Sequence, residues 1–406
     1  MSAQTATAGP PPAAAADRPL TGERAGWAGV ALGVLAFFVA VPPLTVRAQV
    51  VPIVLGVLAV AAGAFAVRER HGRLGWGSIA AGVIGAVGGV AATRSGVGNL
   101  ERVVVWSALL AATLRYATPL LFAALGGLFS ERSGVVNIAL EGMMLMGALF
   151  GVWGSDVTGS WVGGLLVAMV AGGLLALIHA VFAVTLRADQ IVSGTALNFL
   201  ALGITGYAYV DLYGERGTPE NLPSVPDVTL PLIKDIPFVG DVIGQLNLLV
   251  WLGLITAVLT WVVVFRTPVG LRLRSAGENP LAAETAGLSP VRIRYAAVVV
   301  SGMLAAVGGA YLSIGFVHSF TQNMTAGRGF IALAALIFGR WRPGGAFAAT
   351  LLFGFGSALA QRLPVFSPSA ATLFQALPYV LTLIAVAGLI GRSVAPAALG
   401  RPLERS

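Results

Sequence analysis

Long apolar runs alternate with short polar, glycine-rich or proline-rich links along most of this chain. A helix that crosses a bilayer needs about 20 mainly apolar residues, and about twelve stretches come near that length. They are 27–46, 50–67, 75–92, 103–129, 135–153, 161–186, 190–210, 245–265, 295–315, 327–340, 344–362 and 371–391. The pattern predicts an all-α, polytopic transmembrane helical bundle, with about nine core spans or re-entrant segments and three N-terminal helices.

Two of these runs fit a full crossing poorly. The run 103–129 contains Arg115 and Pro119, which favours an interfacial turn followed by a shorter span. The run 327–340 is too short for a comfortable crossing, and whether it crosses or re-enters stays open at this point.

The N-terminal part differs from the rest of the chain. Residues 1–26 are rich in alanine and proline, which predicts a disordered tail. The run 27–46 is interpreted as a retained signal anchor. Residues 27–92 form three accessory spans with hardly a polar residue inside them, so packing against lipid or a partner is their expected role.

Composition supports residence in a membrane. Of 406 residues, 57% are apolar and only 10% charged, whereas soluble domains carry about 25% charged residues. The net charge of +8 comes from arginines that lie between apolar runs. The positive-inside rule accounts for them, so no nucleic acid partner is expected.

Loop charge predicts the orientation in a bacterial inner membrane. The segment 211–244 has more acidic than basic residues and is placed outside, whereas the segment 266–294 is mainly basic and is placed in the cytoplasm. Both chain termini, including a tail at 392–406, then lie in the cytoplasm.

Sequence patterns of catalytic chemistry are missing. There are no cysteines, the histidines lie far apart, and no phosphate-binding GxxxxGK[ST] motif occurs. We therefore expect no metal, no bound cofactor and no ATP site in this chain, and do not expect an enzyme.

Polar residues inside the apolar runs are the candidates for a transport path. Asn137 and Glu141 are four apart and would share one face of a helix. A carboxylate at membrane depth must be paired, protonated or turned to a cavity. A substrate-facing or gating pair and a structural hydrogen bond between helices are both open readings.

Glycines bracket a short apolar piece that begins at residue 327 and ends before Arg340. Short, interrupted segments in two halves of a transporter indicate its binding site, and the pieces around 130–150 and 327–340 could form such a pair. Arg328 either faces a polar group or extends to the outer interface. Asn198 either packs helices together or lines the path.

The basic loop 266–294 contains the signals of a short surface helix. Asn279 can cap it, Pro280 suits its first position, and Gly287 suits the residue after its end. A helix from about Pro280 to Ala286 between two spans could dock into the groove of a soluble partner, although a solvated connector is the alternative.

Four ordered blocks together resemble one known family. They read SERSGVVNIALEGMMLMGA, RADQIVSGTALNFLALG, SAGENPLAAETAGLSPVRIRY and MTAGRGFIALAALIFGRWRPGGA. They are similar to the permeases of ABC importers for branched-chain amino acids, ribose and nucleosides, and most to the nucleoside-type subgroup. The resemblance covers about residues 103–391.

The resemblance implies a translocation path shared with a second, homologous permease. A cytoplasmic ABC ATPase would use ATP and Mg, and an extracellular lipoprotein would deliver a small-molecule substrate. The path residues would be Asn137, Glu141, Asn198, Arg328 and Phe330. The ATPase-coupling residues would be Gly277, Glu278, Asn279, Ala283, Glu284 and Gly287.

Other functions remain open from the sequence. The same family could import branched-chain amino acids or a sugar, and paired charges such as Glu141 and Arg328 would suit an amino acid. An ion-coupled secondary transporter is the alternative of another class, with Glu141 as its carboxylate. A membrane scaffold without transport is a third.

Overall fold

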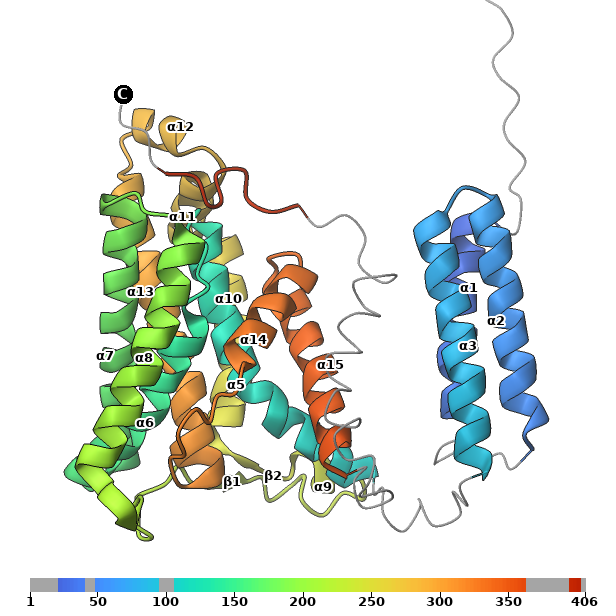
Figure 1. The fold of residues 1–406 in the computed structure, drawn as a ribbon, viewed down its shortest axis with the longest axis horizontal. Coiled ribbons are helices and arrows are strands. Elements are labelled where there is room, and N and C mark those ends of the chain that lie inside the picture. The colour runs from blue at the N-terminus through green and yellow to red at the C-terminus, as the bar shows by residue number, and fades with distance from the viewer. Residues whose placement is uncertain (1–20, 41–47, 95–105, 363–393, 403–406) are drawn as a thin grey trace, which may run out of the picture. The chain divides into compact units, whose positions relative to one another are not determined.

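The computed structural model of the chain describes residues 21–40, 48–94, 106–362 and 394–402. These form two compact units, one built from residues before 104 and the other from residues after it. Residues 1–20 of the expected tail at 1–26, and the expected span at 371–391, lie outside the described residues. Each unit is a bundle of helices and is described by itself (Figure 1).

The first unit is a bundle of three helices, α1 (Gly22–Phe38), α2 (Val50–Arg68) and α3 (Gly72–Arg94). α1 begins five residues before the expected start at 27, because the Thr21 hydroxyl accepts a hydrogen bond from the Arg24 N–H (3.4 Å) and caps the helix. Small residues allow close packing, and the buried Ser78 hydroxyl donates to the Ala59 carbonyl at 2.7 Å.

The second unit contains the remaining elements, most of them helices. They are α5 (Trp106–Arg132), α6 (Leu140–Thr158), α7 (Trp161–Ala180), η2 (Val181–Thr185), α8 (Gln190–Tyr213), η3 (Gly214–Arg216), β1 (Asp227–Thr229), α9 (Val239–Ile243), β2 (Gln245–Asn247), α10 (Leu248–Arg266), α11 (Pro268–Glu278), α12 (Pro280–Thr285), α13 (Pro290–Ala310), η4 (Tyr311–Val317), α14 (Arg328–Phe338) and α15 (Pro343–Arg362). The short strands pair antiparallel, with Asp227 opposite Asn247.

Eight helices of the described residues are long and apolar enough to cross a membrane. They are Val50–Arg68, Gly72–Val90, Trp106–Arg132, Trp161–Thr185, Gln190–Tyr213, Leu248–Arg266, Pro290–Val317 and Pro343–Arg362. The predicted all-α polytopic bundle is therefore confirmed. α14 has 11 residues, so it is about 17 Å long and spans roughly half of a 30 Å hydrocarbon core.

Two expectations for α5 and α6 were wrong. The run 103–129 is no interfacial turn, because α5 continues through Pro119 for 27 residues. Residues 117–128 of α5 are buried among other helices, and such surroundings tolerate a proline inside a membrane helix. The run 135–153 does not start as a helix, since α6 begins only at Leu140.

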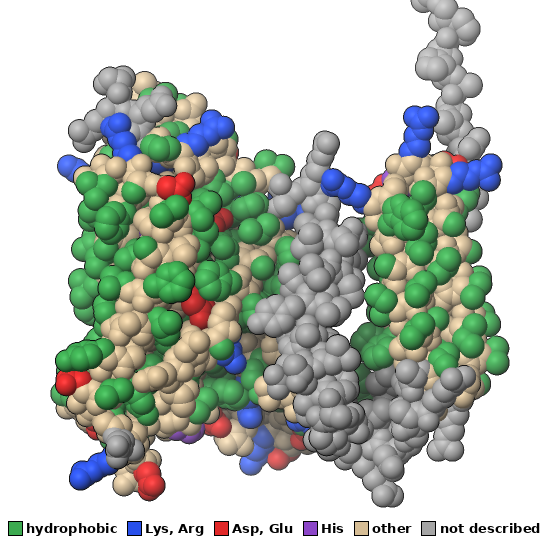
Figure 2. All heavy atoms as spheres, in the orientation of Figure 1, with side chains coloured by type: hydrophobic (Ala, Val, Ile, Leu, Met, Phe, Trp, Pro, Cys, Tyr) green, Lys and Arg blue, Asp and Glu red, His purple; other side chains and the backbone are tan. Residues whose placement is uncertain are grey.

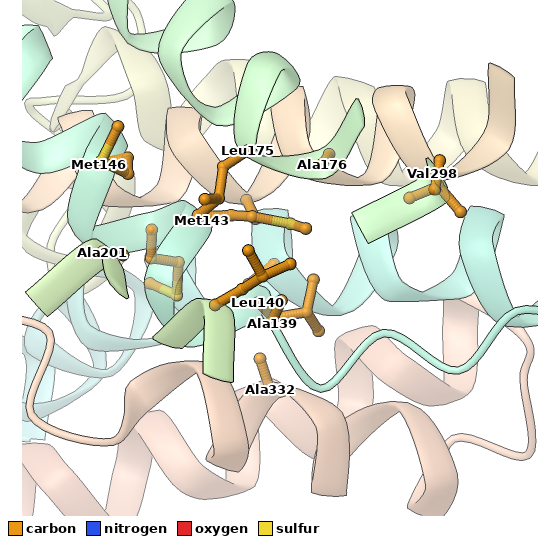
Figure 3. Close-up of a cluster of buried hydrophobic side chains, with 14 of the residues drawn as sticks. Ala139, Leu140, Met143, Met146, Leu175, Ala176, Ala201, Val298 and Ala332 are labelled. Atoms are coloured by element: carbon orange, nitrogen blue, oxygen red, sulfur yellow. The ribbon is translucent and has the colours of Figure 1, made fainter. Parts of the chain in front are cut away.

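The core of the second unit gathers around the start of α6. Side chains from α6, α7, α8, α13 and α14 meet there, among them Leu140, Met143, Leu175, Val298 and Ala332 (Figure 3). Small residues bring α13 against α6 and α7. A Cβ added at Gly302 of α13 would collide with the Ala176 side chain and the Gly172 carbonyl on α7.

The two loops of opposite charge lie at opposite ends of the second unit. α11 and α12 are at one end, and β1, β2 and α9 are at the other (Figure 1). On the face shown in Figure 2, hydrophobic side chains cover much of the second unit between these ends, and most of the Lys and Arg side chains lie near the ends. This distribution suits a protein whose flanks face lipid or other apolar surfaces.

The contact at Gly302 provides a test of the bundle. We expect Gly302→Leu to lower the free energy of unfolding by about 3 kcal/mol or more, because the added atoms overpack a closed contact. The matched control is Gly203→Leu on α8, where nothing lies within 4 Å. Thermal unfolding of the purified chain in detergent measures both, and equal midpoints would contradict the packing described here.

Candidate substrate path and coupling site

The chain is not helical between α5 and α6. Residues 133–139 link the two helices, and Val135, Asn137 and Ala139 in this break are fully buried. A backbone without helical hydrogen bonds is tolerated at membrane depth only where protein or water satisfies it. The partners of this backbone therefore determine how the site is built.

Side chains of α7 and α8 satisfy Val136 in the break. The Val136 N–H donates to Gln190 Oε1 at 2.7 Å, and the Val136 carbonyl lies 2.9 Å from His179 Nε2. His179 is fully buried, and a carbonyl partner requires the proton on Nε2. Both side chains therefore replace helical hydrogen bonds that the break has lost.

Asn198 of α8 bridges the end of the break and the first turn of α6. Its Nδ2 donates to the Ile138 carbonyl at 3.0 Å, and its Oδ1 accepts the Gly142 N–H at 2.7 Å. The amide is half-buried. In this structure Asn198 packs helices together, which was one of its two readings from the sequence.

Asn137 and Glu141 do not share a helical face, so that expectation was wrong. Asn137 lies in the break and donates from Nδ2 to the Ser301 hydroxyl of α13 at 2.8 Å. Glu141 lies in the first turn of α6. Because one residue lies in the break and the other in α6, their side chains contact different partners.

The Glu141 carboxylate holds the start of α14. Oε1 accepts hydrogen bonds from the Thr325 hydroxyl at 2.6 Å and from the Gly327 N–H at 2.8 Å, and Oε2 accepts the Gly329 N–H at 2.6 Å. The first N–H groups of a helix lack partners within it and carry partial positive charge. Glu141 of α6 thus supplies hydrogen-bond acceptors for the start of α14. The two interrupted segments that the sequence suggested as a pair, around 130–150 and 327–340, are therefore in contact.

Arg328 and Phe330 lie at the first turn of α14. Arg328 is half-buried, and its Nη1 donates to the carbonyls of Met324 and Thr325 at 2.9 and 3.1 Å. Phe330 is 47% exposed, whereas Asn137 is fully buried and Glu141 is 8% exposed. Of the five predicted path residues, Phe330 presents the largest accessible face.

A second contact joins the end of α5 to the link between α14 and α15. Arg132 donates to the Trp341 carbonyl from Nε at 3.0 Å and from Nη2 at 2.8 Å. The Trp341 indole donates in turn to the Glu131 carboxylate. Arg340 and Trp341 both have positive φ, 54° and 52°, so this contact holds an unfavourable backbone in place.

The predicted short helix of the basic loop is confirmed as α12. The Asn279 side chain accepts the Ala282 N–H at 3.0 Å and caps the start. At the end, Gly287 has φ +79°, and the Leu288 N–H donates to the Ala283 carbonyl at 3.0 Å. This pattern is a Schellman stop, so the sequence defines both ends of the helix.

The predicted coupling residues divide by exposure. Glu278, Asn279, Glu284 and Gly287 are exposed, whereas Gly277 and Ala283 are buried. Leu281 is 54% exposed on α12. Gly277 packs so closely that a Cβ would collide with the Arg132 carbonyl. α12 therefore offers an outer face while its inner face rests on the bundle.

Several residues that build this site were missed by the sequence reasoning. They are His179, Gln190, Arg294, Ser301, Thr325 and Trp341. Most are polar groups in or beside an apolar run, and that position was the available signal.

The eight spanning helices and the buried polar break define an integral membrane protein of the kind that builds transport paths. The chain belongs to the family of permease components described as branched-chain amino acid transport system / permease component, whose profile matches residues 109–386. The resemblance inferred from the four blocks is thereby confirmed, and the chain is a permease of the ABC transporter type.

Related proteins cover most of the second unit. The guanosine ABC transporter permease protein NupQ of Bacillus subtilis is 42% identical over 314 residues, 75% of this chain and 98% of the relative. The nucleoside permease protein NupC of Lactococcus lactis is 40% identical over 303 residues, 72% and 95%. A putative glucose permease protein of Haloferax volcanii, TsgC13, is 36% identical over 258 residues, 63% and 77%. No solved structure matches the chain.

The Glu141 contact makes a prediction for stability. We expect Glu141→Gln to lower the free energy of unfolding by about 2 kcal/mol, because an amide NH2 would face an N–H donor of α14 and leave it unpaired. Thermal unfolding in detergent measures the change. The control is Glu284→Gln, an exposed carboxylate on α12, and an equal effect of both substitutions would show that the carboxylate does not hold α14.

Proposed function

We propose that this chain forms half of the translocation path of an ABC importer for nucleosides. One observation carries the proposal. The chain is 42% identical to a guanosine permease along 98% of that protein's length, so almost the whole of that relative has a counterpart here.

The residues at the start of α14 suit a flat, neutral solute. Phe330 offers an exposed aromatic face on which a base can stack. Asn198 uses Oδ1 and one Nδ2 hydrogen within the chain, and its second Nδ2 hydrogen is the group proposed to bond a base edge or a ribose hydroxyl. Asn137, Glu141 and Arg328 act on the path by fixing the break and the start of α14, which position the contacting groups.

A second permease completes the path in this proposal. Two different guanosine ABC transporter permease proteins of Bacillus subtilis are similar to this chain, one 42% and the other 28% identical. The nucleoside permease proteins of Lactococcus lactis show the same inequality, 40% and 26%. This supports pairing with a related but unlike subunit.

The exposed face of α12 is the proposed docking site of a cytoplasmic ATPase. That partner, and not this chain, binds ATP and Mg. The basic loop around α12 then lies in the cytoplasm with both chain termini. The acidic segment 211–244 at the opposite end lies outside in the bacterial cell membrane, where a substrate-binding lipoprotein delivers the solute.

Coupling follows from linkage between the two ends. ATP and substrate each bind one conformation of the assembly more tightly, and each therefore shifts the population toward that conformation. Closure of the ATPase moves α12 and, through α11 and α13, the helices that surround the break. The path then opens alternately to the two sides.

A sugar is the second candidate substrate, because a putative glucose permease is among the relatives. An aromatic face such as Phe330 also suits a pyranose ring. A branched-chain amino acid would need free opposite charges, and Glu141 already accepts three hydrogen bonds within the chain. Ion coupling through Glu141 is disfavoured for the same reason.

Uptake by the reconstituted complex tests the proposal. The chain is expressed with the permease, ATPase and lipoprotein encoded beside its gene, and labelled guanosine, glucose and leucine are offered with and without ATP. We expect uptake of the nucleoside alone and only with ATP. Uptake of glucose alone would replace the substrate, and uptake that ignores ATP would refute the ABC mechanism.

Docking at α12 is tested by two matched leucines. We expect Leu281→Glu to lower ATP-driven uptake by about tenfold or more, because a charge replaces an exposed anchor at a docking surface. Leu232→Glu alters a leucine that is 92% exposed in the opposite loop and should leave ATPase binding unchanged. Co-purification of the ATPase distinguishes the variants, and equal binding by both would exclude this docking face.

Stacking on Phe330 is tested through the dependence of uptake on substrate concentration. We expect Phe330→Ala to raise the KM for guanosine about tenfold, because one lost stacking contact with a base contributes about 1–3 kcal/mol. Phe199→Ala, which removes a ring that is 69% exposed on α8, is the control. A KM that stays unchanged in both variants would remove Phe330 from the path.

A further inference from the structure

The C-terminal segment 394–402, here called the strap, folds back onto the end of the second unit that carries α11 and α12 (Figure 1). The Ala398 N–H donates to the Gly277 carbonyl at 2.9 Å, and the Ala397 N–H donates to Glu278 Oε2 at 3.1 Å. Both acceptors belong to the last residues of α11, directly before α12. The strap is thus bonded to the base of the proposed coupling helix.

The same strap is bonded to the break between α5 and α6. The Gly400 N–H donates to the Gly134 carbonyl at 3.1 Å. Gly134 has φ +98°, and an added Cβ would lie 3.3 Å from the Ala398 carbonyl and 2.7 Å from Arg294 Nη2. The strap therefore fits a surface that is closed around this glycine.

Arg294 connects the break and the strap from inside. The side chain is fully buried at the start of α13. Its Nε donates to the Ser133 carbonyl at 3.1 Å, and its Nη1 donates to the Arg401 carbonyl at 3.0 Å. One guanidinium thus joins α13, which follows the coupling loop, to the first residue of the break and to the strap.

Apolar contacts hold the strap in place between these bonds. Ala395 and Leu399 pack against a buried cluster that includes Leu128 of α5, Leu273 of α11 and Trp341. Ala398 is only 6% exposed. Hydrogen bonds and packing together make the strap part of the folded unit.

We propose that the strap and Arg294 form a transmission element that couples movement of α11 and α12 to the break. The inference rests on the proposed function, since it concerns how ATP hydrolysis drives that transport. Without the strap, α12 would reach the break mainly through α11 and α13. α11 itself touches the break, since a Cβ added at Gly277 would lie 3.1 Å from the Gly134 N. The strap adds a second link, from Gly277 through Ala398 and Gly400 to Gly134, which lies near the start of the break that positions Asn137 and Glu141.

Arg294 and the strap are positioning elements, so the test compares uptake with ATP hydrolysis in the reconstituted complex. Ala398→Pro removes the N–H that donates to Gly277, and Ala398→Gly keeps it. We expect Ala398→Pro to hydrolyse ATP at close to the unaltered rate but to lower guanosine uptake per ATP by about tenfold, a usual size for coupling between sites. Arg294→Met should do the same, and Arg294→Lys should retain part of the coupling.

Equal uptake per ATP in Ala398→Pro and Ala398→Gly would overturn the proposal. Failure of the unaltered complex to take up any labelled solute would instead refute the proposed function. These two results are distinguishable because the first requires normal uptake by the unaltered chain.

A second measurement avoids variants that fold poorly. The chain has no cysteine, so Arg272→Cys on α11 and Ala397→Cys in the strap, both at exposed positions, can carry a pair of spin labels. We expect their distance to stay the same with and without ATP, while a reference pair at 272 and 232 changes its distance. A change in the first pair as large as that in the reference pair, or no change in either, would contradict a strap that moves with α11.

Discussion

The unpaired backbone between α5 and α6 is the constraint on which the rest of the second unit depends. Each backbone group left without a partner in an apolar medium costs several kcal/mol. Gln190 and His179 pair the Val136 amide, and Asn198 pairs the groups at the start of α6. Because these side chains come from α7 and α8, the break also fixes where those helices pack. In this unit, these polar side chains of apolar helices serve first as hydrogen-bond partners for the backbone of the break.

The break also explains how so short a helix as α14 is held. The first N–H groups of α14 have no hydrogen-bond partner within the helix, and its 11 residues are too few to cross a membrane. A break before Leu140 places the first turn of α6, with Glu141, beside the first turn of α14. One carboxylate then accepts N–H groups of Gly327 and Gly329. The position of Phe330, and with it the proposed stacking surface, follows from this contact.

Local signals made some elements predictable from the sequence, and distant contacts made others unpredictable. The ends of α12 followed from Asn279, Pro280 and Gly287, because caps and left-handed stops act over a few residues. The spans were predictable because a run of about 20 apolar residues is also a local signal. The break could not be found this way, since its sequence GVVNIA is as apolar as a helix. Its partners lie far along the chain, Gln190 54 and Arg294 161 residues away. Pro119 led to the opposite error, an interruption predicted where the structure has a continuous helix, because burial among neighbouring helices let α5 continue through it.

The hydrogen bonds that Glu141 and Arg328 already make within the chain limit which substrates they could bind. A zwitterionic amino acid needs a free carboxylate and a free cation in the path. Glu141 has three donors on its two oxygens, and Arg328 donates to carbonyls of its own turn. The ring of Phe330 is exposed at the start of α14, whereas the half-buried Asn198 amide is already bonded to the Ile138 carbonyl and the Gly142 N–H. In the proposed path, an exposed aromatic ring favours a neutral solute with a flat face. This description fits a nucleoside better than a sugar, because a sugar offers hydroxyls but no planar base.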